Sequence, residues 1–185
     1  MTEKKTRQDE RELVRRAAGG DADAFGDLYM RYLDDIYQYV FYRVGGKEKA
    51  EDLTERVFLK AWEGIEGYEY GEYPFSSWLY RIAHNAVVDY YRTKKDEASL
   101  ESVSFRLADE TVGPEERLIN EAEGTFLREA LAQLSEEKQQ LLVLRFVQEL
   151  PHAQVAEILG KSEGACRVMQ HRALEALNEL MTKGW

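Results

Sequence analysis

Two aromatic rings and three cations close the stretch VVDYYRTKK, residues 87–95. They are Tyr90, Tyr91, Arg92, Lys94 and Lys95. Rings of this kind stack on unpaired nucleic-acid bases, and arginine and lysine pair with phosphates. The chain as a whole is acidic, with 35 Asp and Glu residues against 25 Lys and Arg and a formal net charge of -10. The run must therefore be judged against the distribution of charge along the chain.

The excess acid is concentrated in one short segment. Residues 1–95 hold 16 basic and 18 acidic side chains, residues 96–123 hold 2 and 9, and residues 124–185 hold 7 and 8. The two flanking parts are nearly neutral, so either can present a local basic face.

A second set of groups suited to DNA lies near the C-terminus, in LPHAQVAEILGKSEGACRVMQHR. Pro151 fits a helix start, Gly160 a turn, and Ser162 the cap of a following helix, which together predict a helix-turn-helix. An ordinary helical hairpin fits the same pattern. The second helix is basic, which favours DNA because phosphates attract cations and helix N-termini; its groups are Lys161, Arg167, His171 and Arg172.

No arrangement of residues indicates catalysis, a cofactor or a metal site. The three histidines, His84, His152 and His171, are scattered, and with the single cysteine, Cys166, they give no metal-ligand spacing. No glycine loop for phosphates is present. We expect no enzyme activity, no cofactor, no metal and no small-molecule substrate, and we expect Cys166 to be a small buried residue.

The sequence also bears on the compartment. One cysteine excludes an internal disulfide and suits a reducing environment. The basic N-terminal stretch is not followed by an apolar run, and no segment approaches the roughly 20 apolar residues of a membrane span. We expect a cytoplasmic protein without membrane insertion.

Apolar residues at three- and four-residue steps predict helices in both flanks of the acidic segment. A first helix ends at Gly19 and Gly20, and Asp21 or Asp23 caps the next one. In a later helix near residues 75–95, the predicted buried face consists of Trp78, Ile82, Ala86 and Tyr90, widened by Leu79, Ala83 and Val87.

The predicted fold is all-α, with an N-terminal helical bundle (residues 10–95) and a C-terminal helix-turn-helix domain (residues 114–185). An extended acidic linker, residues 96–113, joins them, because this segment lacks a sustained helical period and contains Ser, Thr and Gly. Gly113 and Pro114 are predicted to open the next helix. A plain solvated tether is an equally simple interpretation of the linker.

Three stretches resemble bacterial sigma factors of the extracytoplasmic-function group: AEDLTERVFLKAW, PFSSWLYRIAHNAVVDYYR and the terminal helix-turn-helix. The similarity covers about residues 10 to 181. It implies that the first domain binds core RNA polymerase and the melted minus-ten promoter element, and that the last domain binds the duplex minus-thirty-five element. It also implies an anti-sigma protein as a partner.

For the aromatic and basic run at residues 87–95, the resemblance implies a role in binding the minus-ten element. Tyr68 matches an aromatic position in a pocket for an extruded base, and Asn85 matches a position beside it, where an amide can both donate and accept. The tyrosines could instead pack at the rim, and Asn85 could be solvated or form a local cap. The whole candidate set is Tyr68, Tyr70, Tyr73, Asn85, Tyr91, Arg92, Lys94 and Lys95.

The resemblance likewise implies two further sites. The core-polymerase candidates are Asp52, Leu53, Glu55, Arg56 and Phe58, of which Glu55 and Arg56 depart from the usual Gln and Glu and could be merely solvated. The minus-thirty-five candidates are Lys161, Ser162, Arg167, Met169, Gln170, His171 and Arg172. Met169 stands where similar proteins have an arginine, so no promoter consensus is transferred.

The implied function is a promoter-specificity subunit that directs bacterial core RNA polymerase to a dedicated promoter set and assists DNA melting. A stand-alone helix-turn-helix regulator with an N-terminal sensing or dimerisation bundle is the alternative, and it would bind a duplex operator without polymerase. A partner-binding protein that has lost promoter activity is a third interpretation, left open by Glu55, Arg56 and Met169.

Overall fold

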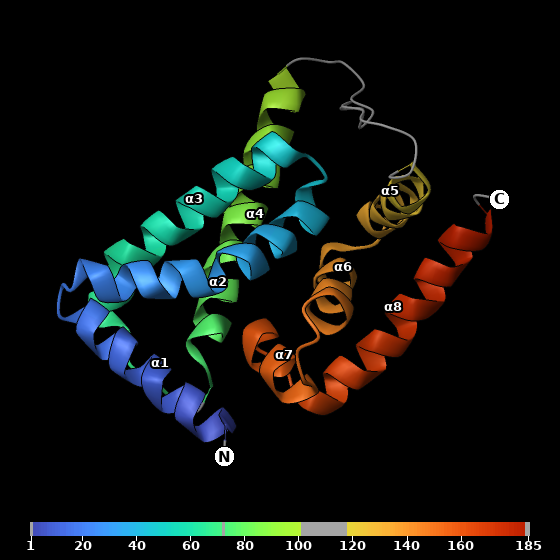
Figure 1. The fold of residues 1–185 in the computed structure, drawn as a ribbon. Coiled ribbons are helices and arrows are strands. Elements are labelled where there is room, and N and C mark those ends of the chain that lie inside the picture. Colours follow the sequence, from blue (N-terminus) through green and yellow to red (C-terminus); the bar gives the residue numbers. More distant parts are fainter. Residues whose placement is uncertain (1, 72, 101–117, 184–185) are drawn as a thin grey trace.

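The computed structural model describes residues 2–71, 73–100 and 118–183, and the regular structure in these ranges is entirely helical (Figure 1), as predicted. The elements of the first half are α1 (Thr2–Ala18), α2 (Ala22–Val44), α3 (Lys47–Gly64), η1 (Ile65–Gly67) and α4 (Phe75–Leu100). Those of the second half are α5 (Leu118–Ala132), α6 (Glu136–Leu142), the π-helical η2 (Val143–Val147), α7 (His152–Leu159) and α8 (Glu163–Lys183).

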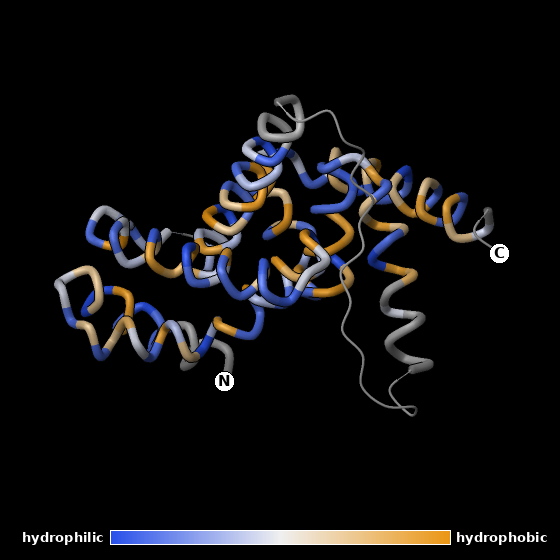
Figure 2. Tube along the Cα trace, turned by 90° about the horizontal axis from the view of Figure 1, so that it is seen from above, coloured by the Kyte–Doolittle hydropathy of each residue, from blue (hydrophilic) through white to orange (hydrophobic). Residues whose placement is uncertain are grey.

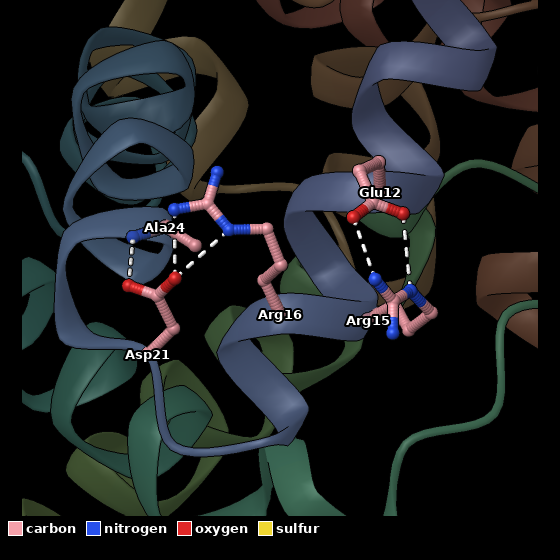
Figure 3. A network of polar contacts seen from close by, with 5 residues as sticks. All are labelled: Glu12, Arg15, Arg16, Asp21 and Ala24. Atoms are coloured by element: carbon pink, nitrogen blue, oxygen red, sulfur yellow. Dashed lines mark hydrogen bonds and ion pairs between the residues drawn. The ribbon is translucent and has the colours of Figure 1, made fainter.

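A two-glycine turn and an aspartate set the angle between α1 and α2. Gly20 has φ 88°, a left-handed conformation that glycine adopts without strain. Asp21 then caps α2, because its carboxylate accepts from the Ala24 N–H at 3.1 Å and from Arg16 Nε at 2.8 Å (Figure 3). Of the two predicted caps, the structure has Asp21.

The core of the first half is made by α2, α3 and α4. On α2 the buried residues at helical spacing include Leu28, Tyr32, Ile36, Tyr39, Val40 and Val44, with Phe25 and Tyr29 partly exposed. On α4 the prediction had the faces in the wrong order. Leu79, Ala83 and Val87 are completely buried, whereas Trp78, Ile82 and Tyr90 are only partly buried at its edge. Both sets have helical spacing, so periodicity alone could not rank them.

The hydrophobic core continues into the second half, beneath the predicted helix-turn-helix. Leu141 and Leu144 pack with Val155 of α7 and with Cys166 of α8, all of them completely buried. Cys166 is thus the small core residue that the sequence predicts. Gly160, with φ 62°, makes the left-handed turn between α7 and α8. Figure 2 shows hydrophobic and hydrophilic residues alternating along these helices, as amphipathic packing requires.

The predicted linker begins later than the sequence indicated. The helix α4 continues through residue 100, so residues 96–100 are helical instead of extended. The cause is local composition, since KKDEASL contains good helix formers and no Gly or Pro. The rest of the predicted linker, with Gly113 and Pro114, lies outside the described residues.

The two halves pack against each other. The helix α7 lies against α4, and η2 and α5 contact α2 (Figure 1). Arg81 of α4 donates to both the main-chain and the side-chain oxygens of Glu157 on α7. Gln154 Nε2 donates to Ser76 Oγ at 3.1 Å, and Tyr80 donates to Gln148 Oε1 at 2.7 Å. Polar contacts therefore join the halves along one side of α4.

Over the ranges that the structure describes, we find no helix with the length and apolar character needed to cross a lipid bilayer.

Candidate nucleic-acid interface

The loop between η1 and α4 is built around a cluster of aromatic rings. We define the η1–α4 loop as residues 68–74, of which residue 72 is not described. The Tyr68 ring lies 4.7 Å from Trp78 and 5.4 Å from Phe75, centroid to centroid. Tyr68 is half-buried, and burial raises the pKa of its hydroxyl to about 12, so the group is a neutral donor at physiological pH. The cluster fixes one face of the ring and leaves part of it accessible.

The loop is also tied to the first helix. Tyr70 donates to Oε1 of Glu10 at 2.5 Å, and the same oxygen accepts from the Phe75 N–H at 3.1 Å. The Arg11 guanidinium lies 4.8 Å from the centre of the Tyr70 ring, within the range of a cation–π contact. Tyr70 is therefore partly buried by α1, and Tyr73 is the third partly buried tyrosine of the loop.

Asn85 is exposed on α4, seven residues beyond Trp78. Seven residues are about two helical turns, so the two side chains lie on the same side of α4. Arg81 lies between them, also exposed, and engages Glu157 of α7. This side of α4 thus carries the Tyr68 cluster at one end, a cation in the middle and an accessible amide at the other end.

The aromatic and basic end of α4 is less open than its sequence indicated. Tyr91 remains 39% exposed, but its hydroxyl donates to the Arg43 carbonyl of α2 at 2.6 Å. Arg92 pairs with Asp89 at 3.2 Å, and the Lys94 ammonium lies 5.9 Å from the centre of the Tyr90 ring. The side chain of Lys95 lies outside the part that the structure describes.

The core-polymerase candidates on α3 divide into two groups. Asp52, Glu55 and Arg56 are exposed, and Arg56 lies 4.0 Å from Asp52 in a one-turn ion pair. Leu53 and Phe58 are 1% and 4% exposed, so in the free protein they lie beneath the surface of α3. These two residues hold α3 against its own bundle, and only the charged three offer a surface.

Three large hydrophobic side chains on α2 and α3 are exposed and were not predicted as part of a site. Leu59 is 58% exposed, Trp62 is 37% exposed, and Met30 of α2 is 73% exposed. The Trp62 ring packs edge-on against Phe25 at 5.0 Å. The signal available in the sequence was Leu59, an apolar residue that falls outside the buried face of α3, which carries Leu53, Val57 and Ala61.

The helix-turn-helix candidates lie at the start of α8. Ser162 Oγ accepts from the Ala165 N–H at 3.1 Å, so it caps α8 as predicted. Two of the nearby cations, Lys161 and Arg167, have an acidic partner in the free protein. Lys161 bonds to Glu137 at 3.0 Å, Arg167 to Glu163 at 3.0 Å, and His171 lies 3.3 Å from Glu175.

Two of the predicted minus-thirty-five residues face inward. Met169 packs against the core, and Gln170 accepts from Arg145 Nε at 3.2 Å. Their orientation follows from Cys166 and Ala173, one heptad apart, which are the buried positions of α8. The outer face instead forms an open hollow lined by Arg167, Val168, His171, Arg172 and Glu175. Val168, 54% exposed, was missed by the sequence reasoning.

Within the described residues, no three His, Cys, Asp or Glu side chains are grouped so that they could hold a metal ion.

Family models match both halves of the chain. Residues 28–97 match Sigma-70 region 2, and residues 127–177 match Sigma-70, region 4. The helical bundle followed by a helix-turn-helix is therefore the architecture of an RNA polymerase sigma factor.

Individual relatives indicate to which group of sigma factors the chain is similar. The chain is 39% identical over 171 residues to the ECF RNA polymerase sigma factor BldN of Streptomyces coelicolor. The matched region covers 92% of this chain and 65% of that protein. It is 35% identical over 163 residues to the RNA polymerase sigma factor YlaC of Bacillus subtilis, covering 87% of this chain and 94% of that protein. The chain belongs to the ECF group of RNA polymerase sigma factors.

A solved structure shares the fold. The sigma factor RpoE of Bartonella quintana, in complex with the anti-sigma factor NepR, has a TM-score of 0.68 and 21% identity to this chain, covering 85% of this chain and 96% of that chain. As a sigma factor, the protein is a promoter-specificity subunit that binds core RNA polymerase and promoter DNA. It is a DNA-recognition subunit rather than a stand-alone regulator.

Proposed function

We propose that the η1–α4 loop and the adjoining side of α4 bind an unstacked base of the minus-ten element. The observation that carries the proposal is the Tyr68 ring, which is held edge-on and tilted by Phe75 and Trp78 yet remains half-exposed. A ring already fixed in place loses little conformational freedom when a base stacks on it. Asn85, exposed on the same side of α4, supplies an amide that can both donate to and accept from a base edge.

The basic end of α4 supports the same assignment. Arg92 is exposed and lies near Asp89, and Lys94 lies beside Tyr90. A surface ion pair is worth about 0–1 kcal/mol, so a phosphate can replace Asp89 at little cost. Tyr91, held by its bond to the Arg43 carbonyl, gives this end a fixed aromatic edge. Together these groups form a path for a melted strand along α4.

We further propose that the outer face of α8 binds the minus-thirty-five duplex. The N-terminus of α8 is capped by Ser162, and Lys161 and Arg167 are paired with exposed carboxylates. Phosphates compete well for such cations because helix N–H groups add to the attraction. In this proposal Arg167 and Val168 contact base edges, and His171 and Arg172 contact the phosphate backbone.

The remaining assignments follow from membership of the ECF group. The charged face of α3 (Asp52, Glu55 and Arg56) is proposed to bind core polymerase, and the domain limits 10–95 and 114–185 stay proposals. We place the protein in the cytoplasm, where bacterial polymerase acts. An anti-sigma partner is supported by the complex of RpoE with NepR.

Run-off transcription with bacterial core polymerase on a promoter library tests the minus-ten proposal. Tyr68→Ala should lower open-complex formation about fivefold or more, because base–aromatic stacking contributes about 1–3 kcal/mol. Tyr68→Phe keeps the ring and should retain most activity. Permanganate reactivity of the melted thymines reports the bubble, and closed-complex binding serves as the control. If the bubble is unchanged in Tyr68→Ala, the pocket lies elsewhere.

A further inference from the structure

Glu10 of α1 is a buried carboxylate with three hydrogen-bond donors from three other elements. It is only 5% exposed. Its Oε1 accepts from the Tyr70 hydroxyl at 2.5 Å and from the Phe75 N–H at 3.1 Å, and its Oε2 accepts from the Tyr32 hydroxyl of α2. A buried charge is costly unless it is fully hydrogen-bonded. Three donors meet this requirement, so the carboxylate is built into the fold as a junction.

The three bonds have one common consequence, which is to fix the η1–α4 loop. Tyr70 lies within the loop and Phe75 directly follows it. One carboxylate oxygen binds both of these residues and therefore holds the ends of the intervening segment together. The Phe75 ring in turn contacts Tyr68 at 5.4 Å. The position of the Tyr68 ring thus depends on Glu10 through two routes, Tyr70 and Phe75.

Glu10 also caps α4 from outside that helix. Phe75 is the first residue of α4, and its N–H has no acceptor within the helix. A carboxylate at this end is stabilised by the helix dipole. Tyr32, whose pKa is raised by burial and by Glu10, donates its proton to the second oxygen and fixes the orientation of the carboxylate against α2.

We propose that Glu10 is a positioning residue for promoter melting, which holds the η1–α4 loop so that the Tyr68 ring is ready to receive an unstacked base. The inference rests on the proposed function of that loop. An apolar residue at position 10 could fill the same space, but it could not join Tyr70, Phe75 and Tyr32. Glu10 does not contact DNA itself, and it acts on minus-ten recognition through the loop.

The test compares Glu10→Ala and Glu10→Gln with Glu12→Ala in the full chain. Glu12 is an exposed residue of the same helix, paired with Arg15 (Figure 3), so its loss is the matched control. Amide hydrogen exchange of peptides from residues 66–78 reports the order of the loop in the free protein. Open-complex formation by the holoenzyme, on promoters with a matched or substituted minus-ten base, reports discrimination.

Glu10→Ala is expected to speed exchange in the loop and to reduce minus-ten discrimination about fivefold or more, which is the range of a lost base–aromatic contact. Discrimination at the minus-thirty-five element and affinity for core polymerase should stay within about twofold of wild type, because the hydrogen bonds of Glu10 involve neither α8 nor α3. Glu10→Gln should be intermediate, since its amide oxygen still accepts from Tyr70 and Phe75. Glu12→Ala should match wild type.

Several outcomes would overturn the inference. One is unchanged loop exchange in Glu10→Ala. Another is faster exchange with normal minus-ten discrimination, while Tyr68→Ala has lost it. An equal loss of discrimination at both promoter elements, or a loss of affinity for core polymerase, would show that Glu10 has a general role in folding. If Glu10→Ala is unfolded, the same measurements on Glu10→Gln decide between the two roles. If Tyr68→Ala also discriminates normally, the proposed role of the loop has failed and the inference fails with it.

Discussion

Arg43 of α2 is completely buried and donates from Nε to Oε1 of Gln139 on α6 at 3.2 Å, across the boundary between the two halves. Its Nη1 donates to the Tyr39 hydroxyl at 3.0 Å, and its Nη2 lies 3.7 Å from the Glu136 carboxylate. A buried guanidinium without acceptors would be strongly destabilising. The second half thus supplies one hydrogen-bond acceptor, Gln139, and a nearby carboxylate, Glu136, to a charge that belongs to the first half, while Nη2 makes no hydrogen bond within the described residues.

Replacing Gln139 by Leu should destabilise the protein by about 1–3 kcal/mol, because it removes an acceptor from a buried cation while keeping a similar volume. Urea unfolding, followed by circular dichroism, measures the change as a shift of the midpoint. The matched control is Gln133→Leu, since Gln133 is exposed directly after α5 and donates to the Glu129 carbonyl of that helix. Equal midpoints for the two variants would contradict a structural role of the Arg43–Gln139 bond.

The same boundary should make stability depend on pH through His84. Burial lowers the pKa of His84 and Arg43 lowers it further, while Glu136, 3.9 Å away, acts in the opposite direction. The folded state therefore favours neutral His84. Its contribution to stability is complete above the unfolded-state pKa of about 6.5 and is lost as the pH falls below that value.

The measurement is the free energy of unfolding of wild type and His84→Gln between about pH 7.5 and pH 5.5. Wild type should lose more stability than His84→Gln over this range. As the pH falls, the unfolded wild type takes up a proton on His84 more readily than the folded protein does, and His84→Gln has no such group. His171→Gln is the control, since His171 is exposed on α8. Parallel pH profiles for all three proteins would exclude His84 as the source.

Local signals in the sequence predicted local structure well. Asp21 next to a two-glycine turn specified the cap of α2, and Ser162 after Gly160 specified that of α8, because both features depend on neighbours within a few residues. The direction of Met169 was not predictable from the resemblance alone. It became clear from Cys166 and Ala173, whose burial is set by packing on α6 and α7.

Long-range contacts gave no comparable signal. Glu10 occupies an amphipathic helix among other charged residues, and its sequence neighbourhood resembles an ordinary solvated face. Its acceptor role depends on Tyr70 and Phe75, which are 60 and 65 residues away. Arg43 likewise meets Gln139 only after the whole chain has folded. Such junctions arise from tertiary packing, which periodicity and capping rules do not describe.

Reversing the charge of Asp52 should weaken binding to core polymerase. Asp52 is exposed on α3 beside Arg56, and Asp52→Arg would place two cations one turn apart on the proposed surface. A mismatched charge at an interface costs several kcal/mol, so a loss of about tenfold or more is expected, with helicity unchanged. A pull-down with core polymerase measures it, with Glu12→Arg on α1 as the control. Equal affinity of Asp52→Arg and wild type would remove α3 from the interface.

Two arginines on the outer face of α8 should have different effects on upstream recognition. Arg167→Ala should relax the preference at one base pair, since an arginine–guanine contact discriminates by about 1–3 kcal/mol. Arg172→Ala should weaken all sequences alike and reduce the salt dependence, as loss of a phosphate contact does. Binding selection at several salt concentrations distinguishes the two. Identical profiles and salt slopes for both variants would contradict these roles.

The acidic segment should reduce binding of the free protein to nonspecific DNA. Residues 96–123 hold 9 acidic and 2 basic residues, a net charge of -7 between two nearly neutral parts that both carry DNA-binding candidates. Duplex DNA is strongly anionic, so this segment repels it over roughly the Debye length, about 10 Å at 0.1 M salt. The test variant has each aspartate replaced by Asn and each glutamate by Gln at five positions, Asp96, Glu97, Glu101, Asp109 and Glu110, so that five carboxylates are removed.

The neutralised variant should bind nonspecific duplex more tightly than wild type at about 0.1 M salt, and the difference should vanish near 1 M, where the Debye length falls to about 3 Å. Fluorescence anisotropy with a labelled random duplex measures both conditions. The matched control changes Ser102 and Ser104 to Asn, which alters the same segment without changing its charge. If the neutralised variant and the control bind alike at low salt, the segment is a spacer whose acidity serves solubility.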